Sequence, residues 1–279
     1  MSLEIALHYY NGTSNFGDQI SPVIVDALLD SKMKRVPWTE NGKAVKMSAV
    51  GSVIHSLRDE TKVWGSGVMM TGLPSDKLKF HAVRGPKTRK FLLECGYAEE
   101  QVPEIYGDPA LLLPEIYTPK VLPWTRDMWA VIPHHSCLDS AHRRNYWGNL
   151  TAEDFEIWEL FGYRVVFPNE PWQDVVDAIA NAKGVISESL HGLILADAYG
   201  VPNVWWNPNG ESGLVGHNGN FKFEDYFESV GQINRKFVPH FEEVTEDNWQ
   251  DLMSVTTETS LVNTEVLREA FPFGSESKV

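Results

Sequence analysis

One stretch near the middle of the chain, residues 180–202, constrains the fold most. Its pattern predicts a short buried strand at 185–186, a polar turn at 187–189 and an apolar helix over 190–199. Gly200 follows directly, as is typical of a helix C-terminus, and a proline comes two residues later. A buried strand that turns directly into a helix is characteristic of parallel α/β folds.

The amino end of this predicted helix is a candidate functional site. A helix that begins directly after a buried strand presents free backbone N–H groups at the carboxyl end of that strand. This place suits an anion, and the titratable base there is His191. Taken alone, the stretch favours a structural interpretation, because Ser187 or Ser189 is an ordinary N-cap residue and a lone histidine is more often structural.

Size, charge and cysteine content exclude several classes of protein. A chain of 279 residues suits two domains better than one large core. A net charge of −14 argues against a nucleic-acid surface and requires a local cationic pocket for any anionic substrate. Cys95 and Cys137 lie too far apart in the sequence to suggest a disulfide framework or a thiolate metal site. No apolar run approaches the ~20 residues of a membrane span, and no basic region precedes the first strand, so we expect a cytoplasmic location.

The first half of the chain alternates predicted strands and helices. A strand over 5–10 is followed by a polar loop over 11–18 and by a helix over 23–29, with Ser21 as N-cap and Pro22 at the first helical position. The loop contains neither a dinucleotide-binding nor a P-loop motif. Further strands are predicted within 46–54, 63–68 and 79–83, and a helix over 87–94.

The second half repeats this alternation after a proline-containing linker over 114–127. The linker predicts two domains, residues 1–120 and residues 121–279, the second of which ends in a helical tail. The two halves together predict an α/β fold with two parallel-sheet domains that face each other across a cleft. Strands are predicted over 128–135, 164–168 and 203–206, and helices over 153–160, 172–182 and within 222–231.

Parallel sheets bind ligands at the carboxyl ends of their strands, so we expect one site that gathers polar residues from both domains. Arg84 is a candidate anion clamp there, although a surface arginine is the alternative. Asp108, before Pro109, is first a predicted helix N-cap and second a candidate catalytic acid. No metal-ligand spacing occurs, which favours metal-free chemistry on an anion. The gathered residues are Asn15, Asp18, Gly65, Gly67, Arg84, His134, His135, Ser187, Ser189 and His191.

Four short motifs occur in a distinctive order: Asn15-Phe16-Gly17-Asp18, Arg84-Gly85-Pro86, Gly107-Asp108-Pro109-Ala110 and Ser187-Glu188-Ser189-Leu190-His191-Gly192. In order and spacing they resemble the polysaccharide pyruvyl transferase family, most closely its short bacterial exopolysaccharide members. The resemblance covers most of the chain, from about Tyr9 to about Gly231. It implies a glycosyltransferase-B-like fold of two Rossmann-like domains. It also implies transfer of a pyruvyl group from phosphoenolpyruvate to a pair of sugar hydroxyls, which gives a cyclic ketal and phosphate without a further cofactor.

The resemblance also implies roles for individual residues. His191 is the expected catalytic residue, because a histidine can donate or accept a proton near neutral pH. Asp18 is the second choice as base, and an ordinary loop or cap residue is an equally good alternative for it. The motifs add Gly17, Leu190 and Gly192 to the expected substrate-binding residues. Many family members have arginine at the position of Ser189, where it would hold the donor's carboxylate or phosphate. The candidates to replace that arginine are Arg84, His134, His135, Arg143 and Arg144.

Two other functions stay open at this point. One is a glycosyltransferase that uses a nucleotide sugar, and the other is a non-catalytic carbohydrate- or nucleotide-binding protein, since a fold does not fix a function. A serine hydrolase is a poor fit, because Ser189 is not part of a G-x-S-x-G turn. The expected partners are phosphoenolpyruvate and a saccharide acceptor. A lipid-linked acceptor would bring the protein to the inner face of the membrane.

Overall fold

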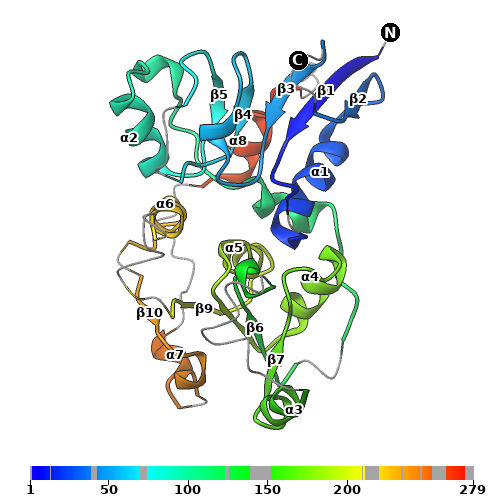
Figure 1. Ribbon diagram of the computed structural model, residues 1–279, viewed down its shortest axis with the longest axis vertical. Helices are drawn as coiled ribbons and strands as arrows, with labels where there is room; N and C mark the ends of the chain where they lie inside the picture. The colour runs from blue at the N-terminus through cyan, green and yellow to red at the C-terminus, as the bar shows by residue number, and fades with distance from the viewer. Residues whose placement is uncertain are drawn as a thin grey trace.

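A computed structural model shows the arrangement of the chain (Figure 1). It describes residues 2–12, 14–38, 43–69, 74–122, 126–138, 152–208, 210, 220–233, 235–245, 247–252 and 262–273. These ranges contain two five-stranded sheets, which lie one above the other in Figure 1.

The first sheet consists of short parallel strands in the order β2-β1-β3-β4-β5. Its central strand β1 pairs on both sides, so that Ile5 lies opposite Arg35 on one neighbour and Val45 on the other. Ile5 and Leu7 are buried, as expected for a central strand of a parallel sheet. The strands are β1 (Leu3–His8), β2 (Met33–Val36), β3 (Val45–Ser48), β4 (Lys62–Trp64) and β5 (Lys79–Ala82).

The second sheet is also parallel, in the order β10-β9-β8-β6-β7. Three of its strands, β6, β8 and β9, are buried along their whole length. Its strands are β6 (Trp129–Ile132), β7 (Tyr163–Val165), β8 (Gly184–Ser187), β9 (Asn203–Trp206) and β10 (Phe237–Val238).

Both sheets have the same topology. Counted within each sheet, the strand order is 2-1-3-4-5, one of the two common orders of doubly wound α/β folds. This confirms the predicted pair of parallel-sheet α/β units. In such sheets the order of the strands reverses at one point, and ligands bind outside the carboxyl ends of the strands at that point. The reversal lies between β1 and β3 in the first sheet and between β6 and β8 in the second.

Helices join the two sheets through a shared apolar core. One buried cluster contains Ile5 and Ile24 from the first unit together with Leu193 and Ile194 from the second. It forms where α1 packs on α4 and where the 3-10 segment Pro109–Glu115 packs on α5. The helices are α1 (Phe16–Leu28), α2 (Pro86–Glu94), α3 (Ala152–Leu160), α4 (Trp172–Asn181), α5 (Leu190–Ala198), α6 (Phe221–Ser229), α7 (Trp249–Leu252) and α8 (Thr264–Glu269).

The first helix begins earlier than the sequence pattern predicts. Residues 16–18 belong to α1 and not to the preceding loop, and Pro22 lies inside the helix. The N-cap is Asn15 instead of Ser21, and its side chain accepts a hydrogen bond from the backbone of Gly17. An internal proline disfavours a helix, but here the buried apolar face that includes Ile20 and Ile24 stabilises it. The motif at 15–18 is therefore a helix N-terminus.

The C-terminal tail packs on the first unit, whereas the domain prediction grouped it with the second. Trp64 on β4 donates a hydrogen bond from Nε1 to the carbonyl of Leu267 in α8, and its ring packs edge-on against Phe271. Figure 1 shows α8 beside the strands of the first sheet. The tail packs on the first unit because Trp64 is a large buried side chain whose indole N–H needs a hydrogen-bond acceptor.

Candidate functional site

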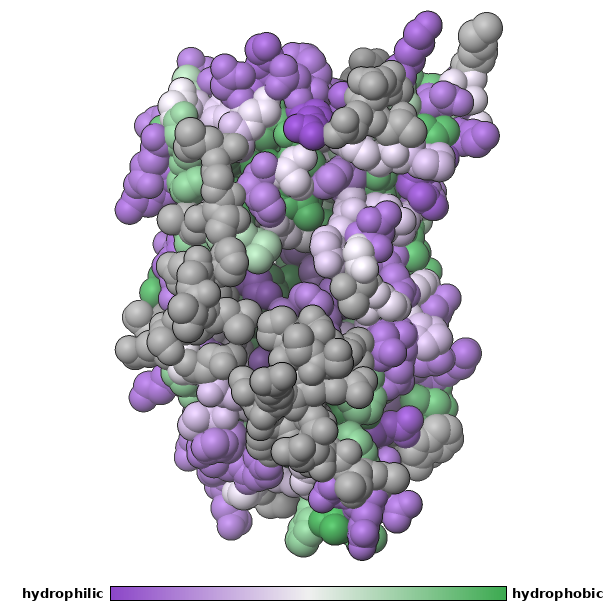
Figure 2. All heavy atoms as spheres, viewed as in Figure 1, coloured by the Kyte–Doolittle hydropathy of each residue, from purple (hydrophilic) through white to green (hydrophobic). Residues whose placement is uncertain are grey.

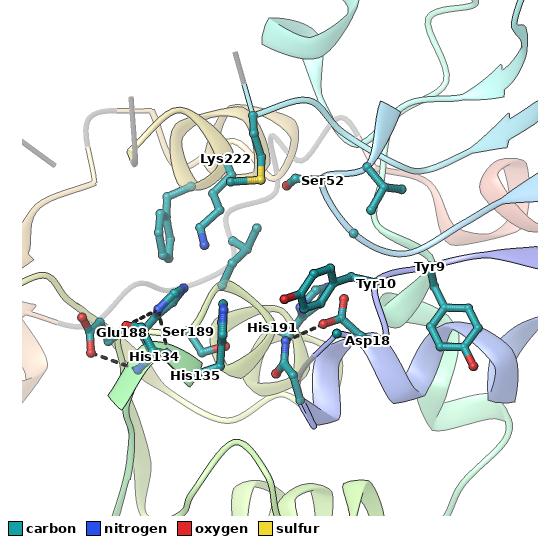
Figure 3. A pocket seen from close by; sticks show the side chains of 18 of the residues that line it. Tyr9, Tyr10, Asp18, Ser52, His134, His135, Glu188, Ser189, His191 and Lys222 are labelled. Carbon is teal, nitrogen blue, oxygen red and sulfur yellow. Dashed lines mark hydrogen bonds between the residues drawn. The ribbon is translucent and has the colours of Figure 1, made fainter. Parts of the chain in front are cut away.

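A cavity of about 770 Å³ lies between the two sheets. The hollow is visible on the face drawn in Figure 2, and Figure 3 shows several of its side chains from close by. Its size is within the usual range for small-molecule sites. The polar and ionisable lining residues include His8, Asn15, Asp18, Ser52, His55, His134, His135, Glu188, Ser189, His191, Asn220 and Lys222.

The cavity is located at the reversal points of both sheets. In the first sheet it is lined by the segment after β1, which includes Tyr10, and by the segment after β3, which includes Ser52. In the second sheet it is lined by His134 after β6 and by residues 188–191 after β8. Because both sheets direct the carboxyl ends of their strands at one cavity, the topology makes this cavity the candidate site.

Three helices open into the cavity at their amino ends. The cavity lining includes Asn15 and Asp18 of the first turn of α1, Ser189 and Leu190 at the start of α5, and Lys222 in the first turn of α6. Each helix N-terminus carries roughly half a positive charge on its free N–H groups. These N-termini and Lys222 supply positive charge to the cavity although the chain carries a net charge of −14, and Asp18 and Glu188 supply carboxyl groups.

Ser187 and Gly192 shape the turn that places α5. The Ser187 hydroxyl donates to the carbonyl of Ser189 at 2.8 Å and accepts from the backbone N–H of Ser189 at 3.0 Å. A Cβ at Gly192 would lie 2.3 Å from the Ser187 hydroxyl, so the turn requires glycine there. Gly200 ends the helix with a φ of +69°, as its position predicts. Ser187 and Gly192 lie behind the cavity wall and are not among the residues that line the cavity.

His191 is held tightly in this wall. The residue is only 9 % exposed, and its Nε2 atom lies 3.7 Å from the Asp108 carboxylate. Gly17 of α1 packs directly on the imidazole, because a Cβ at that position would lie 2.2 Å from Nδ1. The second unit thus supplies the histidine, and the first unit supplies two of its closest neighbours.

Asp18 lies beside His191 in the cavity (Figure 3). Its carboxylate accepts a 2.8 Å hydrogen bond from the Asn15 side chain. Burial raises the pKa of the Asp18 carboxyl, and the nearby His191 and the Asn15 hydrogen bond offset part of this shift. A carboxyl with a raised pKa beside a histidine suits proton transfer.

Lys222 and Glu188 are site residues that the sequence analysis did not select. In Figure 3 the Lys222 ammonium points from α6 into the cavity, toward the wall that carries Ser189. Burial lowers its pKa to about 8, Arg84 adds to this shift, and Glu188 and Asp18 oppose it. Glu188 accepts a hydrogen bond from the backbone of His134 at 2.9 Å, and burial raises its pKa. The available signal for Lys222 was its place at the start of a predicted helix after a polar loop.

Arg84 does not line the cavity, in contrast to its predicted role as an anion clamp. It is fully buried and paired with Asp225 of α6, with Nε 3.1 Å from the carboxylate. Its Nη1 donates to Ser52, a lining residue, so the guanidinium lies one layer behind the wall. Gly67 makes room for this guanidinium, from which a Cβ would be 2.3 Å away, and is likewise not a lining residue.

The structure brings together most of the other predicted site residues. Arg143 and Arg144 lie outside the described residues. Gly65 is not in the cavity wall. Within the described ranges, no group of three histidine, cysteine, aspartate or glutamate side chains could hold a metal ion. Those predicted residues that line the cavity are Asn15, Asp18, His134, His135, Ser189, Leu190 and His191.

The Gly17 contact gives a first prediction. Gly17→Ala is expected to lower turnover by about 10²-fold, because the new methyl group must displace the imidazole of His191. Alanine is a better helix former than glycine, so the thermal midpoint should not fall by more than a few degrees. Steady-state kinetics and thermal unfolding check both expectations. Gln19→Ala, on the same helix and outside the cavity lining, is the control that should retain activity.

The fold and the cavity define a doubly wound α/β protein with an anion-suited site between two parallel sheets. Residues 73–209 match the model of the family described as polysaccharide pyruvyl transferase. This match confirms the resemblance of the motifs to that family.

Individual relatives are distant. The chain is 25 % identical over 229 residues to the uncharacterized protein L143 of Acanthamoeba polyphaga mimivirus, with 82 % of this chain and 75 % of that protein covered. It is 26 % identical over 233 residues to the succinoglycan biosynthesis protein ExoV of Rhizobium meliloti (strain 1021), with 79 % of this chain covered. The match spans 63 % of the length of ExoV. A crystal structure of a functionally uncharacterized Klebsiella pneumoniae protein matches with a TM-score of 0.44 at 13 % identity, over 81 % of this chain and 87 % of that chain.

No helix within the described ranges is long and apolar enough to cross a membrane.

Proposed function

We propose that the protein transfers a pyruvyl group from phosphoenolpyruvate to two hydroxyls of a saccharide, with formation of a cyclic ketal and release of phosphate. The observation that carries this proposal is the cavity in which Lys222, three helix N-termini and the His191–Asp18 pair meet. The match of residues 73–209 to the polysaccharide pyruvyl transferase family supports it. So does the similarity to ExoV, which is named for succinoglycan biosynthesis.

The donor suits the charges of the cavity. Phosphoenolpyruvate carries a carboxylate and a phosphate, and both groups need cationic or N–H partners once they leave water. Lys222 supplies one full positive charge opposite the start of α5, where Ser189 stands in place of the family arginine. We propose that Lys222 together with the free N–H groups of α5 replaces that arginine.

The reaction needs two proton transfers that the cavity can supply. The enol methylene of the donor gains a proton and becomes a methyl group, while the oxygen of the first sugar hydroxyl bonds to the adjacent carbon and loses its proton. The second hydroxyl then bonds to the same carbon as the bond to phosphate breaks, and its proton leaves with the phosphate. We assign proton transfer to His191, with Asp18 as its partner, since both line the cavity.

The remaining wall suits a sugar. Tyr10, Trp205 and Phe223 give it aromatic surface, and Asn207 and Asn220 give it amide groups. Aromatic faces with adjacent amides match the alternating apolar and hydroxyl surfaces of a saccharide. We propose that the acceptor is a free or lipid-linked saccharide of exopolysaccharide biosynthesis, met in the cytoplasm. We also propose that the two units form a glycosyltransferase-B-like pair.

Calorimetric titration with phosphoenolpyruvate tests the proposal. We expect selective binding over inorganic phosphate and over UDP-sugars, and a loss of affinity of at least ~10-fold in Lys222→Gln, because one charge-assisted contact is worth about 1.4 kcal/mol or more. Lys90→Gln changes an exposed lysine outside the cavity and should bind normally. Binding of UDP-sugars without a response to phosphoenolpyruvate would identify a glycosyltransferase instead. Binding of phosphoenolpyruvate without phosphate release in the presence of saccharide acceptors would favour a non-catalytic protein.

The lowered pKa of Lys222 predicts how donor binding depends on pH. The ammonium form binds the anion, so affinity should fall as the pH rises through about 8, where the free protein loses that proton. An unperturbed lysine would keep its charge to about pH 10. Calorimetry at a series of pH values measures the break, which Lys222→Arg should move upward. An affinity that is flat up to pH 10 would contradict the lowered pKa of Lys222 in the free protein, and the contact itself is then decided by Lys222→Gln.

A further inference from the structure

Two buried polar atoms face each other behind the cavity. Asp108 is fully buried, and neither its Oδ2 atom nor the Nε2 atom of His191 has a hydrogen-bond partner among the described residues. The two atoms lie 3.7 Å apart, which is within reach of an ion pair but longer than a formed hydrogen bond. A buried polar atom without a partner is costly, so each of these atoms has the other as its natural partner. Catalytic hydrogen bonds are often long in ligand-free structures and shorten when substrate binds.

The local sequence explains why Asp108 holds this position. Its other oxygen, Oδ1, accepts a 3.0 Å hydrogen bond from the backbone of Ala110 and caps the 3-10 segment that starts at Pro109. Gly107 has a φ of +139°, a conformation that disfavours other residues, and turns the chain into this cap. The cap uses one carboxylate oxygen and leaves the second directed at the histidine.

His191 lines the cavity, and the Nδ1 atom of its imidazole lies against α1. Gly17 lies beside Nδ1, and Asp18, a cavity-lining residue, follows it on the first turn of α1. His191 itself comes from α5 of the second unit, whereas Asp108 and Gly17 both come from the first. The ring is therefore clamped between the units, with Nε2 toward the buried carboxylate.

We propose that Asp108 is the positioning residue of His191. Its carboxylate accepts a hydrogen bond from the Nε2–H group, which fixes the tautomer and leaves Nδ1 free to accept and return a proton in the cavity. The buried negative charge also stabilises the imidazolium that forms when Nδ1 takes up a proton. The expected effect of Asp108 on turnover rests on the proposed function, whereas its expected effect on the tautomer of His191 does not. Among the described titratable groups, Asp18 interacts with both members of this pair and Tyr226 interacts with Asp108. Glu188 and Lys222 line the same cavity as His191.

Asp108→Asn separates the two tasks of this carboxylate. Asparagine caps as well as aspartate, so the 3-10 segment should be retained. Its amide, however, would donate to Nε2 and force the proton onto Nδ1. The ring ¹⁵N chemical shifts of His191, assigned by their loss in His191→Gln, report the tautomer in the whole protein. We expect Nε2–H in the native protein and Nδ1–H in Asp108→Asn, with kcat for phosphate release lowered by ~10²–10⁴-fold and KM changed much less.

Asp177→Asn is the matched control, because Asp177 is also a buried carboxylate but bonds to Tyr117 and Lys120 far from the cavity. It should leave the His191 tautomer and kcat unchanged. A native Nδ1–H tautomer would overturn the proposal without any variant, and so would an unchanged tautomer in a folded Asp108→Asn protein. The expected change of tautomer in a protein that releases no phosphate from phosphoenolpyruvate would support the role of Asp108 and contradict the proposed function instead.

Discussion

His191→Gln is expected to lower the rate of phosphate release from phosphoenolpyruvate by ~10²–10⁴-fold, the range of a lost general acid–base residue. Glutamine retains a polar side chain of similar length but cannot take up a proton near neutral pH. The imidazole lies at the wall of the cavity, next to Asp18 and backed by Asp108. Steady-state kinetics with a saccharide acceptor measures the loss.

A control separates this effect from loss of the fold. His240→Gln changes an exposed histidine outside the cavity lining and should retain full activity. Circular dichroism and the thermal midpoint of His191→Gln should match those of the native protein, and calorimetric affinity for phosphoenolpyruvate should change much less than the rate. Near-native turnover in His191→Gln would exclude the histidine as the proton-transfer group and would move that role to Asp18 or Glu188, whose pKa values burial raises.

The parallel sheets and the approximate site could be predicted because their signals are local. A buried strand followed at once by a helix is visible within residues 184–198, and the same pattern recurs at the start of the chain. Since ligands bind at the carboxyl ends of parallel strands, the residues after each strand could be gathered into one candidate site. His191 and Asp18 were selected in this way, and both line the cavity.

The partners of the charged side chains could not be predicted, because they depend on contacts far apart in the sequence. Arg84 follows a strand as an anion clamp would, yet its charge is neutralised by Asp225, 141 residues further on. Among the described elements, the strand that precedes α6 is β9, which ends at Trp206, well before Lys222, so the strand-end rule did not select this lysine. The start of α1 was misplaced for a local reason: Ser21-Pro22 is a frequent helix start, and the buried apolar face outweighed it.

Asp225→Asn is expected to cost about 3–5 kcal/mol of unfolding free energy, the range for removing one partner of a buried ion pair. Asp225 and Arg84 are both fully buried, and the carboxylate also accepts hydrogen bonds from the backbone and hydroxyl of Thr88, at 2.8 and 2.7 Å. The neutral amide would leave the guanidinium of Arg84 buried and uncompensated. Equilibrium unfolding in urea measures the loss. Asp26→Asn breaks a solvent-exposed pair with Arg35 and should cost no more than about 1 kcal/mol.

The same pair also has a functional consequence, because it anchors the helix that carries Lys222. Asp225 lies three residues after Lys222 on α6, and it ties that helix to Arg84 and Thr88 of the first unit. Weakening this link lets α6 shift, so Asp225→Asn should also reduce affinity for phosphoenolpyruvate, whereas Asp26→Asn should not. Equal losses of unfolding free energy in Asp225→Asn and Asp26→Asn would show that the buried Arg84–Asp225 pair stabilises the fold no more than a surface ion pair does. A large loss of stability with native donor affinity would show instead that Lys222 is positioned without the Arg84–Asp225 link.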